Sequence, residues 1–183
     1  MSQGSRRIAW ATRAQARTAI LNCTIMAIAT LITYWLVTSL LSRVYSISRA
    51  DDLLGGLWAV IATIFVYRDS YEQSVTAAVS RMAATSVSFV LCLIYLIFLP
   101  AYGWAVAVLV GLSALAVMLI GRPGDAVTAA ITTAVVMIVA TVTPRDAWEQ
   151  PILRFADTLI GVAVGVTAAW IGLRLIGQRV EPR

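Results

Sequence analysis

Two short stretches place arginine beside hydroxyl or carboxylate groups inside otherwise apolar sequence. In the first, an arginine shares one helix face with three residues that follow it at helical spacing: Arg81, Thr85, Ser88 and Cys92. In the second, Arg154 precedes Asp157 and Thr158, so the guanidinium and the carboxylate can pair at i, i+3. Guanidinium groups only donate hydrogen bonds, and a charge in an apolar run usually faces protein or a water-filled cavity. The two stretches therefore predict contacts for a passing anion.

A second interpretation of both arginines stays open. Arg81 and Arg154 each stand near the start of an apolar run, so their side chains could extend to the lipid headgroups and act as anchors. Asp157 is too short to extend far. It is the one titratable carboxyl well inside an apolar run, so proton coupling has one clear candidate and a passive channel is not excluded.

The composition predicts that these residues sit in a lipid bilayer. Hydrophobic residues make up 60% of the chain and charged residues 13%, against about half and a quarter in soluble domains. We expect an all-α, polytopic membrane protein, because backbone exposed to lipid must bond to itself. The six predicted transmembrane helices are 18–41, 53–67, 75–99, 103–120, 126–142 and 152–176. They form one domain, 18–176, between an interfacial or cytoplasmic lead-in, 1–17, and a tail, 177–183.

From the residue types in the chain we expect no metal site, no cofactor, no enzymatic activity and no nucleic-acid partner. The chain has no histidine, and Cys23 and Cys92 lie in apolar runs without metal-ligand spacing, so we expect no metal and no cofactor. No serine nucleophile motif or carboxylate dyad is found, so we expect no enzyme. All 14 basic residues are arginine, and the net charge of +5 sits in loops and termini, which indicates membrane orientation and no nucleic-acid partner. With the N-terminus inside, ten arginines face the cytoplasm and four face outward, so both termini are predicted to be cytoplasmic.

A repeated hexamer predicts internal symmetry. "RDSYEQ" (68–73) recurs as "RDAWEQ" (145–150), and "RMAAT" (81–85) recurs as "RFADT" (154–158). Each pair sits at the same joint of a three-helix unit, and an odd number of helices turns the second unit upside down. The sequence thus predicts a 3+3 inverted repeat, an architecture of secondary transporters.

The hexamer itself is interpreted mainly as structure. Asp69 is predicted to cap a helix with Glu72 three residues on, while Tyr71 and Trp148 suit the membrane interface. The short segment 53–67 has its counterpart at 130–144. Such a pair could present helix N-termini to an anion, or could be short helices in a thinned bilayer.

Small residues predict a tightly packed last helix. Gly161, Gly165 and Ala169 follow Asp157 at every fourth position. Rows of this kind let helices approach closely in membranes.

Three stretches carry a family resemblance: "GGLWAVIATIFVY", "RMAATSVSFV" and "RFADTLIGVAVGV". They resemble the fusaric acid resistance and aromatic acid exporter superfamily, distant kin of plant aluminium-activated malate channels. The residues that match the family pattern are Trp58, Arg81, Thr85, Arg154, Asp157, Thr158 and Gly161. The resemblance covers about residues 18–175, and Ser88 departs from it where relatives often have glycine.

The resemblance implies export or channelling of organic anions, aromatic carboxylates among them, by a homodimer in a bacterial inner membrane. The residues expected to bind substrate or line its pathway are Arg81, Thr85, Ser88, Arg154, Asp157, Thr158 and Trp58. The alternative is a non-transporting membrane scaffold or assembly partner, which the small size and lack of a soluble domain favour.

Overall fold

The computed structural model describes residues 3–41, 49–142 and 147–177, and side chains in 15–39, 51–142 and 147–175. The helices are α1 (Gln3–Trp35), the π-helical turn η1 (Leu36–Leu41), α3 (Arg49–Val66), α4 (Tyr71–Phe98), α5 (Gly103–Leu119), the 3-10 turn η2 (Pro123–Asp125), α6 (Ala126–Val142) and α7 (Glu149–Gly177). No strand occurs in these ranges, so the predicted all-α class is confirmed. The predicted tail lies outside the described residues, except for Gly177.

Helix α3 starts earlier than the sequence predicted. The predicted segment began at residue 53, close to Gly55 and Gly56, whereas the helix begins at Arg49 and holds both glycines in its interior. They are tolerated there because neighbours approach closely. A Cβ on Gly56 would lie 2.8 Å from Thr38 Cγ2, and one on Gly55 would lie 3.0 Å from a carboxylate oxygen of Asp157.

The predicted cap of α4 is also corrected. The residue at the cap position is Ser70, whose side-chain oxygen accepts a hydrogen bond from the backbone N–H of Gln73. Asp69 stands one residue further out, so the predicted Asp69–Glu72 capping pair is wrong. Serine and aspartate have similar preference for this position, so sequence alone did not separate two adjacent candidates. In the second hexamer, residues 145–146 lie outside the described part of the chain.

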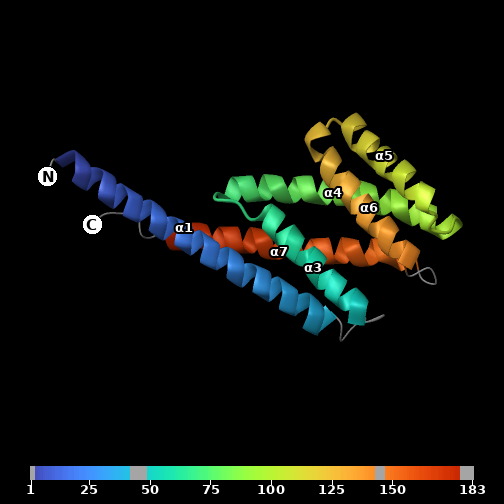
Figure 1. The fold of residues 1–183 in the computed structure, drawn as a ribbon, viewed down its shortest axis with the longest axis horizontal. Helices are drawn as coiled ribbons and strands as arrows, with labels where there is room; N and C mark the ends of the chain where they lie inside the picture. Colours follow the sequence, from blue (N-terminus) through green and yellow to red (C-terminus); the bar gives the residue numbers. More distant parts are fainter. Residues whose placement is uncertain (1–2, 42–48, 143–146, 178–183) are drawn as a thin grey trace.

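Helices α4 and α7 pack along each other at the centre of the molecule (Figure 1). Helix α3 packs chiefly on α7, and α6 packs on α4 and on α5. Helix α1 covers α3 and α7 and extends beyond the other helices at its N-terminal end (Figure 1). The start of α1 and the end of α7 lie toward the same end of the molecule.

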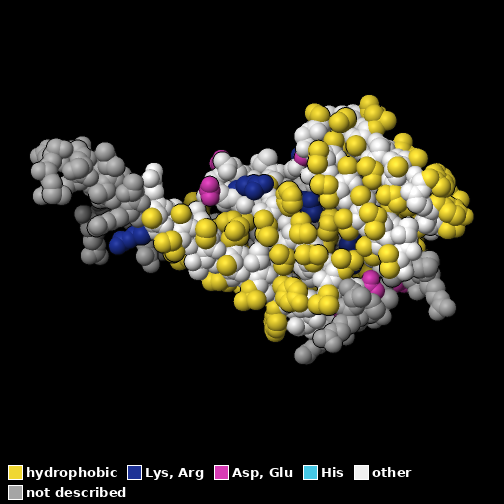
Figure 2. Space-filling view, viewed as in Figure 1, with side chains coloured by type: hydrophobic (Ala, Val, Ile, Leu, Met, Phe, Trp, Pro, Cys, Tyr) yellow, Lys and Arg dark blue, Asp and Glu magenta, His cyan; other side chains and the backbone are white. Residues whose placement is uncertain are grey.

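The chain is a multi-pass membrane protein by the length and apolar character of its helices. Within the described residues, four helical stretches are long and apolar enough to cross a bilayer: Gln15–Ser39, Tyr71–Phe98, Pro123–Val142 and Glu149–Leu175. Helix α5 is apolar but has 17 residues, and α3 carries an arginine and two aspartates in its first turn. Apolar side chains cover most of the described part of the visible face (Figure 2). Passage of α3 and α5 through the bilayer, and so the count of six, stays a prediction.

The small residues of α7 make the contacts predicted for them. A Cβ on Gly161 would lie 2.2 Å from the backbone oxygen of Ala59, and one on Gly165 would lie 3.0 Å from that of Thr63. Ala169 is buried in a cluster with residues of α1 and with Tyr67. The glycines thus bring the α3 and α7 backbones close together.

Candidate functional site

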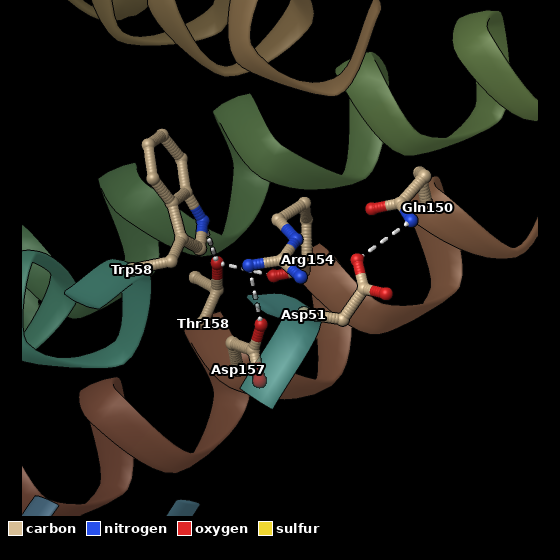
Figure 3. Close-up of polar contacts among 6 residues, drawn as sticks. All are labelled: Asp51, Trp58, Gln150, Arg154, Asp157 and Thr158. Atoms are coloured by element: carbon tan, nitrogen blue, oxygen red, sulfur yellow. Dashed lines mark hydrogen bonds and ion pairs between the residues drawn. The ribbon is translucent and has the colours of Figure 1, made fainter. Parts of the chain in front are cut away.

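A buried ion pair lies where α7 faces α3 (Figure 3). Arg154 Nη1 and Asp157 Oδ2 are 3.1 Å apart, and their side chains are 1% and 3% exposed. The i, i+3 spacing on α7 brings the two groups together, as the sequence predicted. The contact lacks hydrogen-bond geometry, and Arg154 Nε has no acceptor among the residues described. The guanidinium therefore keeps unused donor capacity in a site shielded from solvent.

Helix α3 brings a second carboxylate to the same place. Asp51 Oδ1 accepts a hydrogen bond of 3.3 Å from Gln150 Nε2, and Asp51 acts electrostatically on Arg154 (Figure 3). Gly55 lies one helical turn beyond Asp51, and its missing side chain makes room for the Asp157 carboxylate. The close approach of α3 and α7 thus sets one guanidinium among two carboxylates.

Trp58 connects this cluster to the other arginine. Its indole Nε1 donates a 3.0 Å hydrogen bond to Thr158 Oγ1, which donates to the backbone oxygen of Arg154 at 2.8 Å (Figure 3). The Arg81 guanidinium carbon lies 5.2 Å from the centroid of the Trp58 ring system and 5.1 Å from that of Phe65. Trp58 therefore has the Arg81 guanidinium over its ring and the Arg154 turn of α7 at its indole nitrogen.

Arg81 is a buried cation that pairs with no carboxylate of the described residues. The residue is 4% exposed, and its Nε and Nη2 have no hydrogen-bond partner within the described ranges. Aromatic rings stabilise a guanidinium through their π-electron faces, but they accept no conventional hydrogen bond. A bound anion can supply the negative charge and the hydrogen-bond acceptors that Arg81 lacks in this environment.

The structure bears on two pairs of interpretations that the sequence left open. Neither Arg81 nor Arg154 extends to a surface, because neighbouring helices enclose both side chains, so the anchoring interpretation is wrong. The helix N-termini proposed for anion binding already face acids of this chain. Asp51 and Asp52 stand in the first turn of α3, and Asp125 precedes α6 and pairs with Arg122 at 3.0 Å. A substrate anion there would meet like charge.

The predicted polar face of α4 is buried as a whole. Arg81, Thr85, Ser88 and Cys92 are each at most 4% exposed. Ser88 Oγ lies 2.9 Å from the backbone oxygen of Ala129, which joins α4 to α6. Thr85 lies one turn beyond Arg81 and contributes an unpartnered hydroxyl. The predicted residues thus form two groups on either side of Trp58.

Sequence reasoning missed four residues of this site: Asp51, Gly55, Phe65 and Gln150. The repeated hexamer contained a usable signal, since Gln150 is its last letter. Asp51 belongs to an acidic pair directly before an apolar run, which is also what an ordinary first helical turn looks like. No local sequence pattern identifies Phe65 or Gly55 as site residues, because Phe65 contacts Arg81 of α4 and Gly55 contacts Asp157 of α7.

Comparison with known proteins identifies the family. The family model described as fusaric acid resistance protein-like matches residues 28–168, which include α3 to α6 and every site residue named above. No curated protein and no solved structure matches the chain. The matched range covers most of the chain, and its helices are those of a membrane transporter-like protein. The chain belongs to the fusaric acid resistance protein-like family.

Proposed function

We propose that this protein is a transporter or channel for organic anions, aromatic carboxylates among them, and that Arg81 attracts the anion. The observation that carries the proposal is the buried Arg81 guanidinium, which has two unpartnered nitrogens and no carboxylate against it in the part of the chain that the structure describes. A buried cation without a counter-charge is costly, and a ligand carboxylate would remove that cost.

Arg154 serves as the second contact in this proposal. Asp157 neutralises part of its charge, so that an anion is held there without being trapped. Conduction requires release as well as binding. Thr85 offers an unpartnered hydroxyl one turn beyond Arg81, and Trp58 contacts both arginine regions. Ser88 and Thr158, whose hydroxyls bond to backbone oxygens, are proposed to line the pathway.

The proposed topology is a 3+3 inverted repeat with both termini cytoplasmic. Helix packing supports it: α3 of the first unit packs on α7 of the second, α6 of the second packs on α4 of the first, and α4 and α7 pack on each other. A two-fold axis in the membrane plane would relate these pairs. The described ends of α1 and α7 lie toward one end of the molecule, as an even number of crossings requires (Figure 1). The proposed location is a bacterial inner membrane, and the proposed oligomer is a homodimer.

The test is anion flux into liposomes with a panel of aromatic and aliphatic carboxylates. Wild-type protein is expected to carry carboxylates, and Arg81→Gln is expected to lower flux at least tenfold. A matched control is Arg174→Gln, because Arg174 also stacks on a tryptophan, Trp170, but lies exposed at the end of α7. This control is expected to transport at the wild-type rate.

Two results would contradict the proposal. Absence of flux for every carboxylate, with folded wild-type protein in the liposomes, would favour the scaffold or assembly-partner alternative. Equal flux in wild type and Arg81→Gln would leave transport standing and remove Arg81 from the pathway. We propose no enzymatic activity, and incubation with the same carboxylates should return them chemically unchanged.

A further inference from the structure

Two buried threonines differ from all the others in the described chain. Six threonines are buried. Thr33, Thr63, Thr132 and Thr158 each donate to the backbone oxygen four residues earlier. That bond is the ordinary way for a helix to satisfy a buried hydroxyl. Thr85 and Thr133 do not make it, and neither hydroxyl has a hydrogen-bond partner of standard geometry.

Thr85 belongs to a polar row on one face of α4, and Thr133 lies on α6, which packs against α4. At about 100° per residue, five α4 residues fall within an arc of roughly 80°: Arg81, Thr85, Ser88, Cys92 and Tyr95. The row extends for about 21 Å at 1.5 Å per residue, which is most of a hydrocarbon core of about 30 Å. The Tyr95 hydroxyl is also buried without a partner.

Helix α6 completes the far part of this row. The Thr133 hydroxyl faces the Cys92 thiol across the α4–α6 interface. A thiol is a weak hydrogen-bonding group, so this neighbour leaves the hydroxyl poorly satisfied. Between the two unpartnered threonines, Ser88 Oγ donates a 2.9 Å hydrogen bond to the Ala129 backbone oxygen, which holds α4 and α6 in contact.

The cost of these hydroxyls argues for a ligand. A buried donor without an acceptor destabilises a fold, whereas an apolar group of the same shape would not. Valine has that shape and is common in this chain. The groups without a partner along the row are the Arg81 guanidinium, which only donates, and the hydroxyls of Thr85, Thr133 and Tyr95, which are free to donate. A partly dehydrated anion satisfies all of them, and a cation would be repelled by Arg81.

We infer that α4 and α6 enclose an anion route with two stations, Arg81 with Thr85 and, about 10 Å further along α4, Thr133. The Ser88–Ala129 contact separates the stations in this structure. The inference rests on the proposed transport function and adds a second station to it. The ligand class is a monovalent anion that accepts single hydrogen bonds, which a carboxylate and a halide both do.

The test compares Thr133→Val with Thr132→Val. The two threonines are adjacent on α6 and equally buried, but Thr132 donates to the Thr128 backbone oxygen at 2.8 Å. Thr133→Val is expected to raise the thermal unfolding midpoint by about 2–4 °C and to lower liposome flux of chloride and benzoate about tenfold. Thr132→Val is expected to lower the midpoint and to keep wild-type flux. Thr85→Val should behave like Thr133→Val and serves as the second variant.

Anion binding is measured separately, so that the two proposals can fail independently. In detergent, chloride or benzoate should raise the wild-type midpoint relative to sulfate, which is divalent, strongly hydrated and outside the proposed ligand class, at equal ionic strength. Thr133→Val should lose much of that shift. If wild type shows the shift but no flux, transport is refuted and the anion stations are supported. If Thr133→Val loses stability and keeps both flux and shift, its hydroxyl is structural and the inference is overturned.

Discussion

Removing Arg154 should destabilise the protein strongly, because it leaves Asp157 as a buried charge without its partner. The two side chains are 1% and 3% exposed, and the charged atoms are 3.1 Å apart. At an effective dielectric constant of about 20, that distance corresponds to an attraction of about 5 kcal/mol. Breaking buried pairs from one side costs about 3–5 kcal/mol in proteins. Asp51 also acts electrostatically on the Arg154 guanidinium and would lose the same counter-charge.

The assay heats the purified protein to a series of temperatures and uses size-exclusion chromatography to measure the fraction that remains folded. With about 2–4 °C per kcal/mol for a chain of this size, Arg154→Ala should lower the unfolding midpoint by about 10 °C. Removing both charges with Asp157→Ala in addition should restore more than half of that loss. Flux should not return in the double variant, because the guanidinium that meets the anion is still missing.

The chain offers a matched control for this experiment. Arg122 and Asp125 also pair at i, i+3, with 3.0 Å between the charged atoms, but the Arg122 side chain is 35% exposed. Exposed pairs contribute at most about 1 kcal/mol, so Arg122→Ala should change the midpoint by a few degrees at most. The reasoning is refuted if Arg154→Ala unfolds at the wild-type temperature. It is also refuted if the double variant is no more stable than the single one.

Three further predictions follow from packing, charge and orientation. Gly161→Ala should prevent folding or lower the unfolding midpoint by more than 10 °C, because its Cβ would lie 2.2 Å from a backbone oxygen of α3. Gly111→Ala is the control and should be tolerated, because a Cβ there would meet no atom within 4 Å. Arg81→Ala should fold with a midpoint within about 3 °C of wild type but lose most anion flux, because no ion pair is broken; a large loss of stability would show a structural role. Single cysteines at Gln3 and Gln178, in a background without native cysteines, should react with an impermeant reagent from the cytoplasmic side, and labelling from outside would reverse the orientation.

The sequence alone was sufficient to predict the features that depend on the local spacing of residues and on an apolar membrane environment. Helix α6 has the predicted bounds because a largely apolar stretch without any charged residue runs between a Pro-Gly-Asp turn and Pro144. The Arg154–Asp157 pair was predictable because i, i+3 neighbours on a helix meet whatever else the helix contacts. The glycine row of α7 indicated close packing for the same reason, since it describes one helix face.

The tertiary structure decided which groups are left without partners. Arg81 and Arg154 looked alike in sequence, yet Arg154 is set among carboxylates of α3 and α7, whereas Arg81 meets two aromatic rings of α3. Thr132 and Thr133 are identical neighbours, yet the Thr132 hydroxyl donates to a backbone oxygen, whereas the Thr133 hydroxyl has no such bond. These differences arise from contacts between residues far apart in the chain. Local patterns fix which face a residue occupies, but the helix that covers that face determines the charge and hydrogen-bonding capacity that remain.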